Sequence, residues 1–138
     1  MNRRKGFTLV ELMVVILIVS ILAAVAIPIL RGRIDAAKWS EGKAMMGSIA
    51  TAIRAYAAEK GPTGTIPTTL QDIGFTTLTD LDGTYFLNGC FTYTVGSLDP
   101  LAFVITGTAA NGRGGRPSFP PVVTLTYTVA NGTVWNPL

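Results

Sequence analysis

The chain has 138 residues, of which 49% are hydrophobic and 14% are charged, with a formal net charge of +3. It contains no histidine and a single cysteine, Cys90. The commonest general base and metal ligand is therefore missing, and an intramolecular disulfide is excluded. Three of the eleven basic residues, Arg3, Arg4 and Lys5, precede the first of the eight acidic ones. The basic excess lies wholly in the first six residues, so it does not indicate a nucleic-acid partner.

The first thirty residues divide into a basic leader, 1–6, and an apolar span, 7–30. The span carries one charged residue, Glu11. A helix needs about 20 apolar residues to cross the hydrocarbon core of a bilayer, so the span predicts a single membrane-crossing helix. The basic leader predicts a cytoplasmic N-terminus by the positive-inside rule.

Residues 31–60 continue this helix as an amphipathic segment. Lys60, Gly61 and Pro62 form a helix stop, because a cation, a glycine able to turn left-handed and a proline follow one another. Pro28 is a helix kink, so the sequence predicts one bent helix from about Phe7 to Lys60. The apolar positions of the second half recur at helical spacing, and they are Ile34, Met45 or Met46, Ile49, Ile53 and Tyr56.

Residues 61–138 change to a period of two and to β-branched and aromatic residues, which predicts an antiparallel sheet. Asn131-Gly132 is a strong hairpin signal. Residues 84–88 either extend the first strand or stand alone, and 107–121 form a glycine- and proline-rich loop. The expected strands are 90–95, 101–106, 122–129 and a short 133–135, with a hairpin loop over 96–100. The fold class is therefore α+β, with the sheet packed on Ile49, Ile53 and Tyr56.

The run Arg3-Arg4-Lys5-Gly6-Phe7-Thr8-Leu9-Val10-Glu11-Leu12 resembles the processing motif of type IV prepilins. In that family, which includes the pseudopilins of type II secretion, a basic leader ends in glycine, phenylalanine follows, and a glutamate lies four residues further on. The resemblance extends to about residue 60. It implies cleavage after Gly6, N-methylation of Phe7, and a lollipop-shaped subunit with a long N-terminal helix on a small antiparallel sheet.

The residues themselves are consistent with this chemistry. A glycine before the scissile bond lets a protease approach the backbone closely. Glu11 lies one helical turn from Phe7 and is the only ionisable side chain of the span, which is typical of a functional residue. Its charge is expected to meet the Phe7 amine of a neighbouring subunit and set the register of assembly. Alternatively, Glu11 only lies at the level of the lipid headgroups.

Two other interpretations stay open. The basic start, the apolar run and Ala24-Val25-Ala26 also fit a secretory signal cleaved after Ala26, although the run is long, contains Glu11 and would leave Pro28 second in the product. A protein of another class would be a monomeric single-pass or secreted protein whose β domain binds a ligand. The sequence does not decide between pilus and pseudopilus, between major and minor subunit, or between adhesion, motility, DNA uptake and secretion.

No catalytic residue, cofactor or metal site is predicted. Loop 111–116 reads as a mobile loop or an anion contact. Four aspartates, Asp72, Asp80, Asp82 and Asp99, offer oxygens for calcium, but 107–121 and 130–138 contain no carboxylate, so the calcium site of major pseudopilins looks absent. The resemblance implies as partners identical or homologous subunits, a prepilin peptidase and methyltransferase, an inner-membrane assembly platform and, before assembly, membrane lipid. It places the precursor in a bacterial inner membrane and the product in a periplasmic or extracellular filament.

Overall fold

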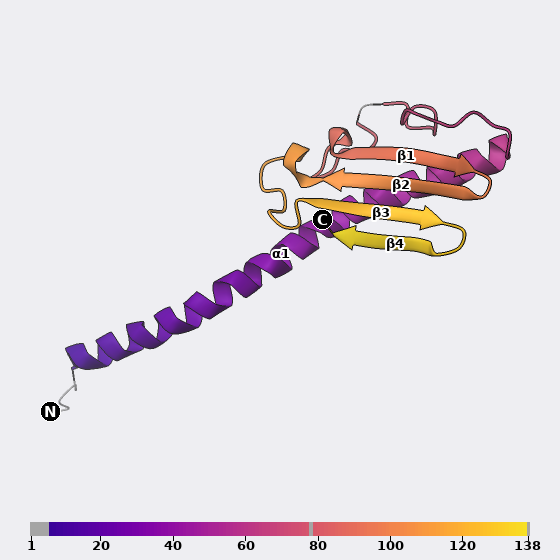
Figure 1. Cartoon of the computed structure of the whole chain (residues 1–138). Helices are drawn as coiled ribbons and strands as arrows, with labels where there is room; N and C mark the ends of the chain where they lie inside the picture. The colour runs from indigo at the N-terminus through magenta and orange to yellow at the C-terminus, as the bar shows by residue number, and fades with distance from the viewer. Residues whose placement is uncertain (1–5, 78, 138) are drawn as a thin grey trace. The chain divides into compact units, whose positions relative to one another are not determined.

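The computed structural model describes residues 6–77 and 79–137 (Figure 1), so the basic residues of the leader lie outside the described residues. The chain forms two compact units, Met1–Ile34 and Asp35–Leu138. Helix α1, Leu9–Lys60, runs through the boundary between them. The N-terminal unit is helical from Leu9, two residues later than expected, and the C-terminal unit contains the whole sheet.

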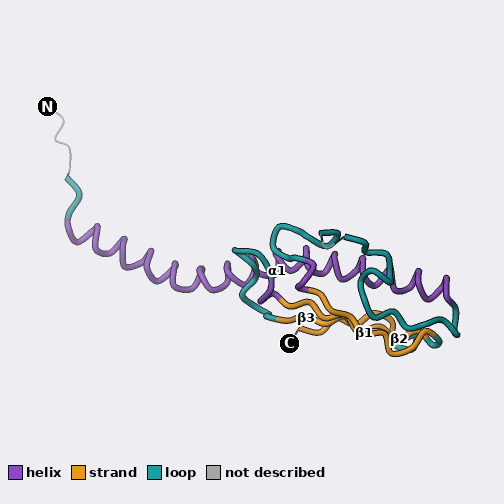
Figure 2. The backbone as a smooth tube through the Cα atoms, turned by 90° about the horizontal axis from the view of Figure 1, so that it is seen from above, coloured by secondary structure: helices purple, strands orange, loops and turns teal. Residues whose placement is uncertain are grey.

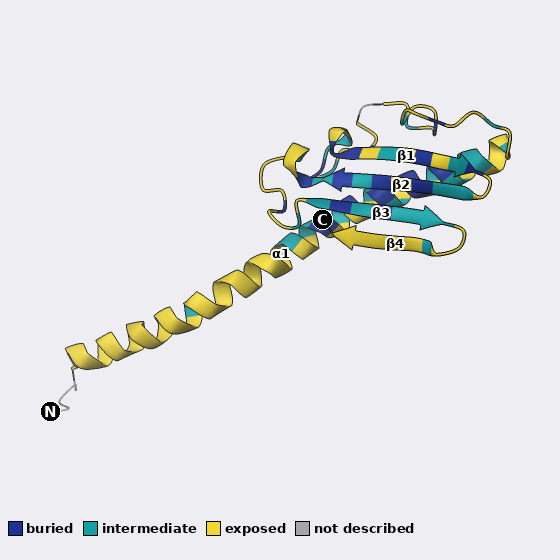
Figure 3. Cartoon of the chain, in the orientation of Figure 1, coloured by how far each residue is buried: buried dark blue, intermediate teal, exposed yellow. Residues whose placement is uncertain are grey.

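The N-terminal unit exposes nearly all of its apolar side chains (Figure 3). The large hydrophobic residues between Leu9 and Leu30 are 48% to 74% exposed. This part of α1 is long and apolar enough to cross a membrane. A continuous apolar surface of this size on a chain is stable only when lipid or another protein covers it.

Helix α1 ends where the sequence predicts. Its last residue is Lys60, and Gly61 follows with φ of +68°, in the left-handed region. The N–H of Gly61 donates to the carbonyl oxygen of Ala57 at 2.9 Å. A glycine at this position carries no Cβ penalty, so it satisfies a terminal carbonyl and turns the chain out of the helix.

The C-terminal unit is a four-stranded antiparallel meander with strand order β1-β2-β3-β4. The part of α1 from residue 35 to 60 lies along one face of this sheet, which Figure 2 shows as two layers. This confirms the predicted α+β class. The strands are β1 (Phe91–Leu98), β2 (Leu101–Thr108), β3 (Val122–Thr128) and β4 (Gly132–Pro137), and short 3-10 turns, η1 (Asn88–Cys90) and η2 (Ala109–Asn111), precede β1 and follow β2.

The core lies between residues 35–60 of α1 and the sheet. The ring centroids of Trp39 and Phe86 are 4.8 Å apart, and those of Phe86 and Phe91 are 5.8 Å apart. Fully burying such a side chain contributes roughly 1.5–3 kcal/mol. The core includes Trp39, Met46, Ile49, Ile53, Phe86, Phe91, Phe103, Ile105, Val123 and Leu125. Ile49 and Ile53 face the sheet as predicted, and Tyr56 packs at the edge of this core, partly buried.

Two positions of the predicted helix face differ. Ile34 is 43% exposed, so it does not belong to the buried face of α1, which begins at Trp39. Trp39, which the predicted face omitted, is 2% exposed. The buried positions of α1 are 39, 42, 46, 49, 50 and 53. All but 50 follow one another at steps of three and four, and this spacing is complete only when glycine 42 is counted as a core position.

Glycine lets the helix and its partners approach closely at Gly42. A Cβ at this position would lie 2.9 Å from Cζ of Phe86, below ordinary van der Waals contact. Gly107 on β2 has the same role, because its Cβ would lie 2.9 Å from Sδ of Met46. Both glycines therefore have a packing reason, although glycine at position 42 weakens the helix by its propensity.

The strand ends also differ from the expectation. Gly96, Ser97 and Leu98 belong to β1 and not to a hairpin loop, because a bulge between Val95 and Ser97 restores the pairing with β2. Strand β4 is longer than predicted and pairs with β3 up to Pro137. Residues 84–87 are irregular and add no strand. The 107–121 loop is shorter than expected, since residues 107 and 108 end β2.

Candidate processing and assembly site

The predicted cleavage point lies just before the helix. Gly6 and Phe7 are outside any regular element and both are exposed, Phe7 at 74%. A Cβ at Gly6 would meet no described atom within 4 Å. Packing within the described residues therefore does not require glycine at position 6. Close access of a protease to the backbone is a requirement that glycine does meet.

Thr8 and Glu11 close the first turn of α1 by a reciprocal pair of hydrogen bonds. The backbone N–H and the hydroxyl of Thr8 donate to Oε2 of Glu11 at 2.9 and 2.7 Å. The N–H of Glu11 donates to the hydroxyl oxygen of Thr8 at 3.2 Å. With Thr8 as the N-cap and Glu11 as the third helical residue, this is a capping box, which satisfies N–H groups that the helix leaves without partners.

The capping box gives Glu11 a local task that the sequence reasoning missed. The signal was present, since a threonine three residues before a glutamate, ahead of an apolar run, is the sequence pattern of this cap. Both bonds from Thr8 end on Oε2. Within the described residues Oε1 accepts no hydrogen bond, so it can still accept one from a cation outside the chain.

Beyond this turn, the apolar part of α1 has few polar features. The hydroxyl of Ser20 donates back to the carbonyl oxygen of Ile16 at 2.6 Å, so it is satisfied inside the helix. Pro28 lies inside α1 and has no N–H to donate to the preceding turn. The helical segment includes the proline, and a kink at Pro28 stays a prediction.

Three of the four aspartates considered for calcium, Asp72, Asp80 and Asp82, accept backbone N–H groups of nearby turns. Oδ2 of Asp72 accepts the N–H groups of Thr68 and Thr69 at 2.9 and 2.8 Å. These bonds hold the pKa of Asp72 below its usual value. Asp80 accepts the N–H of Thr77 at 2.9 Å. Within residues 6–77 and 79–137, no group of three or more His, Cys, Asp or Glu side chains is arranged to hold a metal.

The two arginines of loop 111–116 have different surroundings. Arg113 is tied down: its Nε donates to the carbonyl oxygen of Gly83 at 3.2 Å, and its Nη2 lies 3.5 Å from Oδ2 of Asp82. Arg116 is exposed and lines an open hollow next to residues 115–121. Cys90 is buried, and its Sγ accepts the N–H of Leu87 at 3.3 Å, which indicates a structural role.

Comparison with known proteins adds two findings. A family model described as the prokaryotic N-terminal methylation motif matches residues 1–27. The chain is also 34% identical over 124 residues to a fimbrial protein of Dichelobacter nodosus, an alignment that covers 75% of this chain and 76% of that relative.

Two other relatives align with less than half of this chain. The chain is 47% identical over 53 residues to a fimbrial protein of Moraxella nonliquefaciens, and it spans about a third of that relative, 34%. It is 45% identical over 58 residues to type II secretion system core protein G of Pseudomonas aeruginosa, which covers 41% of each chain. No solved structure matches the chain significantly.

Proposed function

Because this chain belongs to the type IV pilin family, which includes the secretion pseudopilins, we propose that it is a structural subunit of a type IV pilus or of a pilus-like filament. It is made as a precursor with a leader over 1–6, trimmed after Gly6 by a prepilin peptidase, and methylated at Phe7. It then polymerises with copies of itself or with homologous subunits. We propose no catalytic role for it.

One arrangement carries this proposal. An exposed glycine that packing does not require is followed by Phe7, by the Thr8–Glu11 capping box, and by a long helix whose apolar side chains are exposed. Hydrolysis after Gly6 would place a new amine beside the first turn of a helix that already has its cap. The product is a preformed apolar helix with a charged end, which suits burial among like helices.

Assembly then depends on the charge at this end. The amine of Phe7 stays cationic after methylation, and Oε1 of Glu11 is free to accept a hydrogen bond from it. In a filament, the amine of one subunit and Glu11 of its neighbour attract one another. A buried pair of this kind contributes less to net stability than to register, because desolvation offsets much of the attraction.

Before assembly, the precursor is anchored in a bacterial inner membrane by residues 7–30. Arg3, Arg4 and Lys5 keep its N-terminus on the cytoplasmic side, so the continuation of the helix, 31–60, and the β-rich part, 61–138, lie on the other side. Its partners there are membrane lipid, the peptidase and methyltransferase, and the assembly platform. The filament itself is periplasmic or extracellular.

A role in secretion is the second candidate. It is favoured by the 45% identity over 58 residues to type II secretion system core protein G. Deleting the gene distinguishes the two. A pilus subunit is required for filaments on the cell surface, whereas a pseudopilin is required for export of secreted enzymes.

Processing is the first test. We expect native material to begin at Phe7 and to carry a methyl group on that amine, because Gly6 and Phe7 follow a basic leader and precede the capped helix. Mass spectrometry of the N-terminal peptide measures this. A chain that begins at Ile27 indicates a secretory signal, and an intact Met1 indicates an unprocessed anchor. Electron microscopy of material sheared from the cell surface shows whether filaments form.

A further inference from the structure

A loop of the C-terminal unit, residues 115–121, is fastened to the first turns of α1 in that unit. Oδ2 of Asp35 accepts the N–H groups of Ser118 and Phe119 at 3.0 and 3.1 Å. The indole N–H of Trp39 donates to the carbonyl oxygen of Pro120 at 2.8 Å. Within the loop, the side chain of Pro117 is buried. The backbone of the loop is therefore held at a defined place next to Asp35.

This fixed loop presents a large aromatic ring to the outside. The side chain of Phe119 is 73% exposed, although its own N–H is bound. Presenting phenylalanine in this way leaves apolar area in water and contributes nothing to the core. The bound backbone therefore holds this ring at the surface, where lipid or another protein can contact it.

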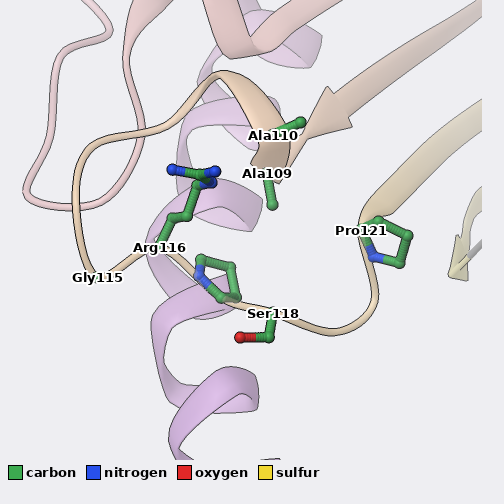
Figure 4. Close-up of a pocket in the computed structure, with 7 residues that line it drawn as sticks. Ala109, Ala110, Gly115, Arg116, Ser118 and Pro121 are labelled. Carbon is green, nitrogen blue, oxygen red and sulfur yellow. The ribbon is translucent and has the colours of Figure 1, made fainter.

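The same loop carries an unpaired cation beside a hollow. Figure 4 shows the side chain of Arg116 reaching from the loop into the space that the loop partly encloses. Within the described residues, Arg116 makes no ion pair, whereas Arg113 lies beside Asp82. The hollow has a volume of about 440 Å³ and is open to solvent. It is lined by Ala109, Ala110, Gly115, Arg116, Pro117, Ser118 and Pro121.

The chain itself keeps this loop near the apolar span. Only four residues separate Leu30, the last residue of the span, from Asp35, and two of them are the exposed Arg31 and Arg33. Five residue steps reach at most about 18 Å when fully extended. This limit comes from covalent length and holds for any orientation of the two units. In a membrane-anchored chain, Asp35 and the loop bound to it stay close to the lipid headgroups.

We propose that loop 115–121 is a contact surface for the anionic phospholipid headgroups of the membrane that anchors the precursor before assembly. The guanidinium of Arg116 binds a lipid phosphate, a group that arginine recognises through paired N–H donors. The ring of Phe119 enters the interface between headgroups and acyl chains, as exposed aromatic residues do at membrane surfaces. Arg31 and Arg33 add attraction for the same anionic surface.

This proposal depends on the proposed membrane-anchored precursor, and it gives the β-rich part a function of its own. Lipid contact would hold the C-terminal unit against the membrane until assembly removes the subunit from the bilayer. Phe119 and Arg116 would lose their lipid contacts when the subunit leaves the bilayer. The contact is electrostatic in part, so salt should weaken it as the Debye length falls from about 10 Å at 0.1 M to about 3 Å at 1 M.

The test places a fluorescent probe on the loop of the full chain in lipid nanodiscs, at one chain per disc. In a Trp135→Phe background, Phe119→Trp adds a reporter on the loop, and Trp39 remains buried in both proteins compared. Val129→Trp is the matched control, since Val129 is also exposed, at 63%, but lies in the β3–β4 turn. With brominated phosphatidylglycerol in the disc, quenching of the Phe119→Trp reporter is expected, with little quenching of the Val129→Trp reporter.

Three further measurements decide the outcome. Replacing phosphatidylglycerol by phosphatidylcholine, raising the salt concentration, or adding Arg116→Gln should each reduce quenching at position 119. Equal quenching at 119 and 129, or none at 119 in an inserted chain, overturns the proposal. Shielding of position 119 only when two copies share a disc assigns the surface to a second subunit and also overturns it. Failure of residues 7–30 to insert would instead contradict the proposed anchored precursor.

Discussion

At the residue scale, Glu11 combines a local bond with a charge. Its Oε2 closes the capping box with Thr8, while Oε1 has no partner in the described chain. These two features act on different properties. The hydrogen bonds stabilise the first turn of α1, as N-cap bonds from Asp, Ser and Thr do in other helices. The charge is available to a neighbouring subunit, so substitutions can separate the two.

We expect Glu11→Gln to lower filament yield, while membrane insertion and cleavage after Gly6 continue. Glutamine keeps the size and much of the hydrogen bonding of glutamate but removes the charge that attracts the Phe7 amine, and an uncharged span inserts at least as readily. Filament mass sheared from cells and the mass of the mature N-terminus measure the two effects.

Thr8→Val is the matched control, because it removes the capping hydroxyl and keeps the charge of Glu11. If charge pairing guides assembly, Thr8→Val should retain more filament than Glu11→Gln. Wild-type filament yield in Glu11→Gln would refute the charge mechanism. Equal loss in both variants would contradict a leading role for the charge, because the cap would then matter as much for assembly.

A second carboxylate, Glu41, organises the core of the C-terminal unit. Its Oε1 accepts the N–H groups of Tyr85 and Phe86 at 2.8 and 3.0 Å, and this positions the ring of Phe86 against Trp39. Partial burial raises the pKa of Glu41, but the bonds from Tyr85 and Phe86 outweigh it, so the pKa lies below its ordinary value of 4.5. Folding therefore favours the ionised carboxylate.

The sign of the pH effect follows from this lowered pKa. Glu41 contributes stability above pH 4.5, and that contribution is lost as the pH falls from 4.5 through the lower pKa of the folded state. We expect Glu41→Gln to be less stable than the wild type at neutral pH and the difference to shrink in acid. Thermal unfolding of the full chain in detergent, followed from pH 7 to pH 3, measures it. A difference that is constant over this range would contradict the assigned role.

At the scale of elements, the approach of α1 to the segment before β1 depends on Gly42. A Cβ at position 42 would lie only 2.9 Å from the ring of Phe86. Phe86 is itself fully buried, at 0% exposure, and packs against Trp39 and Phe91, so it has little freedom to move aside. Glycine lowers helix propensity at this position, but a larger residue would push the helix away from the segment that carries Phe86.

We expect Gly42→Ala to destabilise the C-terminal unit. Overpacking a tight core costs roughly 1–3 kcal/mol, while alanine regains at most about 1 kcal/mol of helix propensity. Gly47→Ala is the control on the same helix, since its Cβ would meet no described atom within 4 Å, and it should be neutral or stabilising by up to about 1 kcal/mol. Denaturant unfolding measures both, and equal stability of the two variants would contradict the packing argument.

Pro28 gives the prediction for the N-terminal half of α1. Because proline donates no hydrogen bond and crowds the preceding turn, we expect the helix to bend or lose hydrogen bonds there. In filaments of the type IV pilins that the sequence resembles, the helix often unwinds just before this proline, and the matching stretch here is 20–27. A filament density map measures this directly, and Pro28→Ala should straighten the segment. A straight, continuous helix through residues 20–30 in the wild-type filament would refute the prediction.

At the scale of the whole molecule, the proposed removal of residues 1–6 would change the charge balance. The precursor has a net charge of +3, and three of its eleven basic residues precede Gly6, against eight acidic residues that all follow it. The proposed mature chain has formally equal numbers of basic and acidic side chains. Like subunits with little net charge repel one another weakly, which is compatible with dense packing of copies in a filament.

Much of the fold followed from local pattern. The apolar run, the stop at Lys60-Gly61-Pro62 and the alternation after residue 90 predicted the helix, its end and an antiparallel sheet, because each depends on neighbouring residues along the chain. The strand ends were less predictable. Gly96 lies in a bulge of β1, not in a turn, and pairing with Phe103 and Ala102 on the adjacent strand decides that.

The sequence alone determined the processing motif, the apolar span and the fold class, since leader, glycine, glutamate and hydrophobic period are all read within one segment. Only the tertiary structure revealed what depends on residues far apart in the chain. Asp35 binds a loop more than eighty residues away, Gly42 accommodates Phe86, and Arg113 and Arg116 have different surroundings although they share one loop. The physical reason is that side-chain partners, unlike helical or strand period, are set by packing between elements.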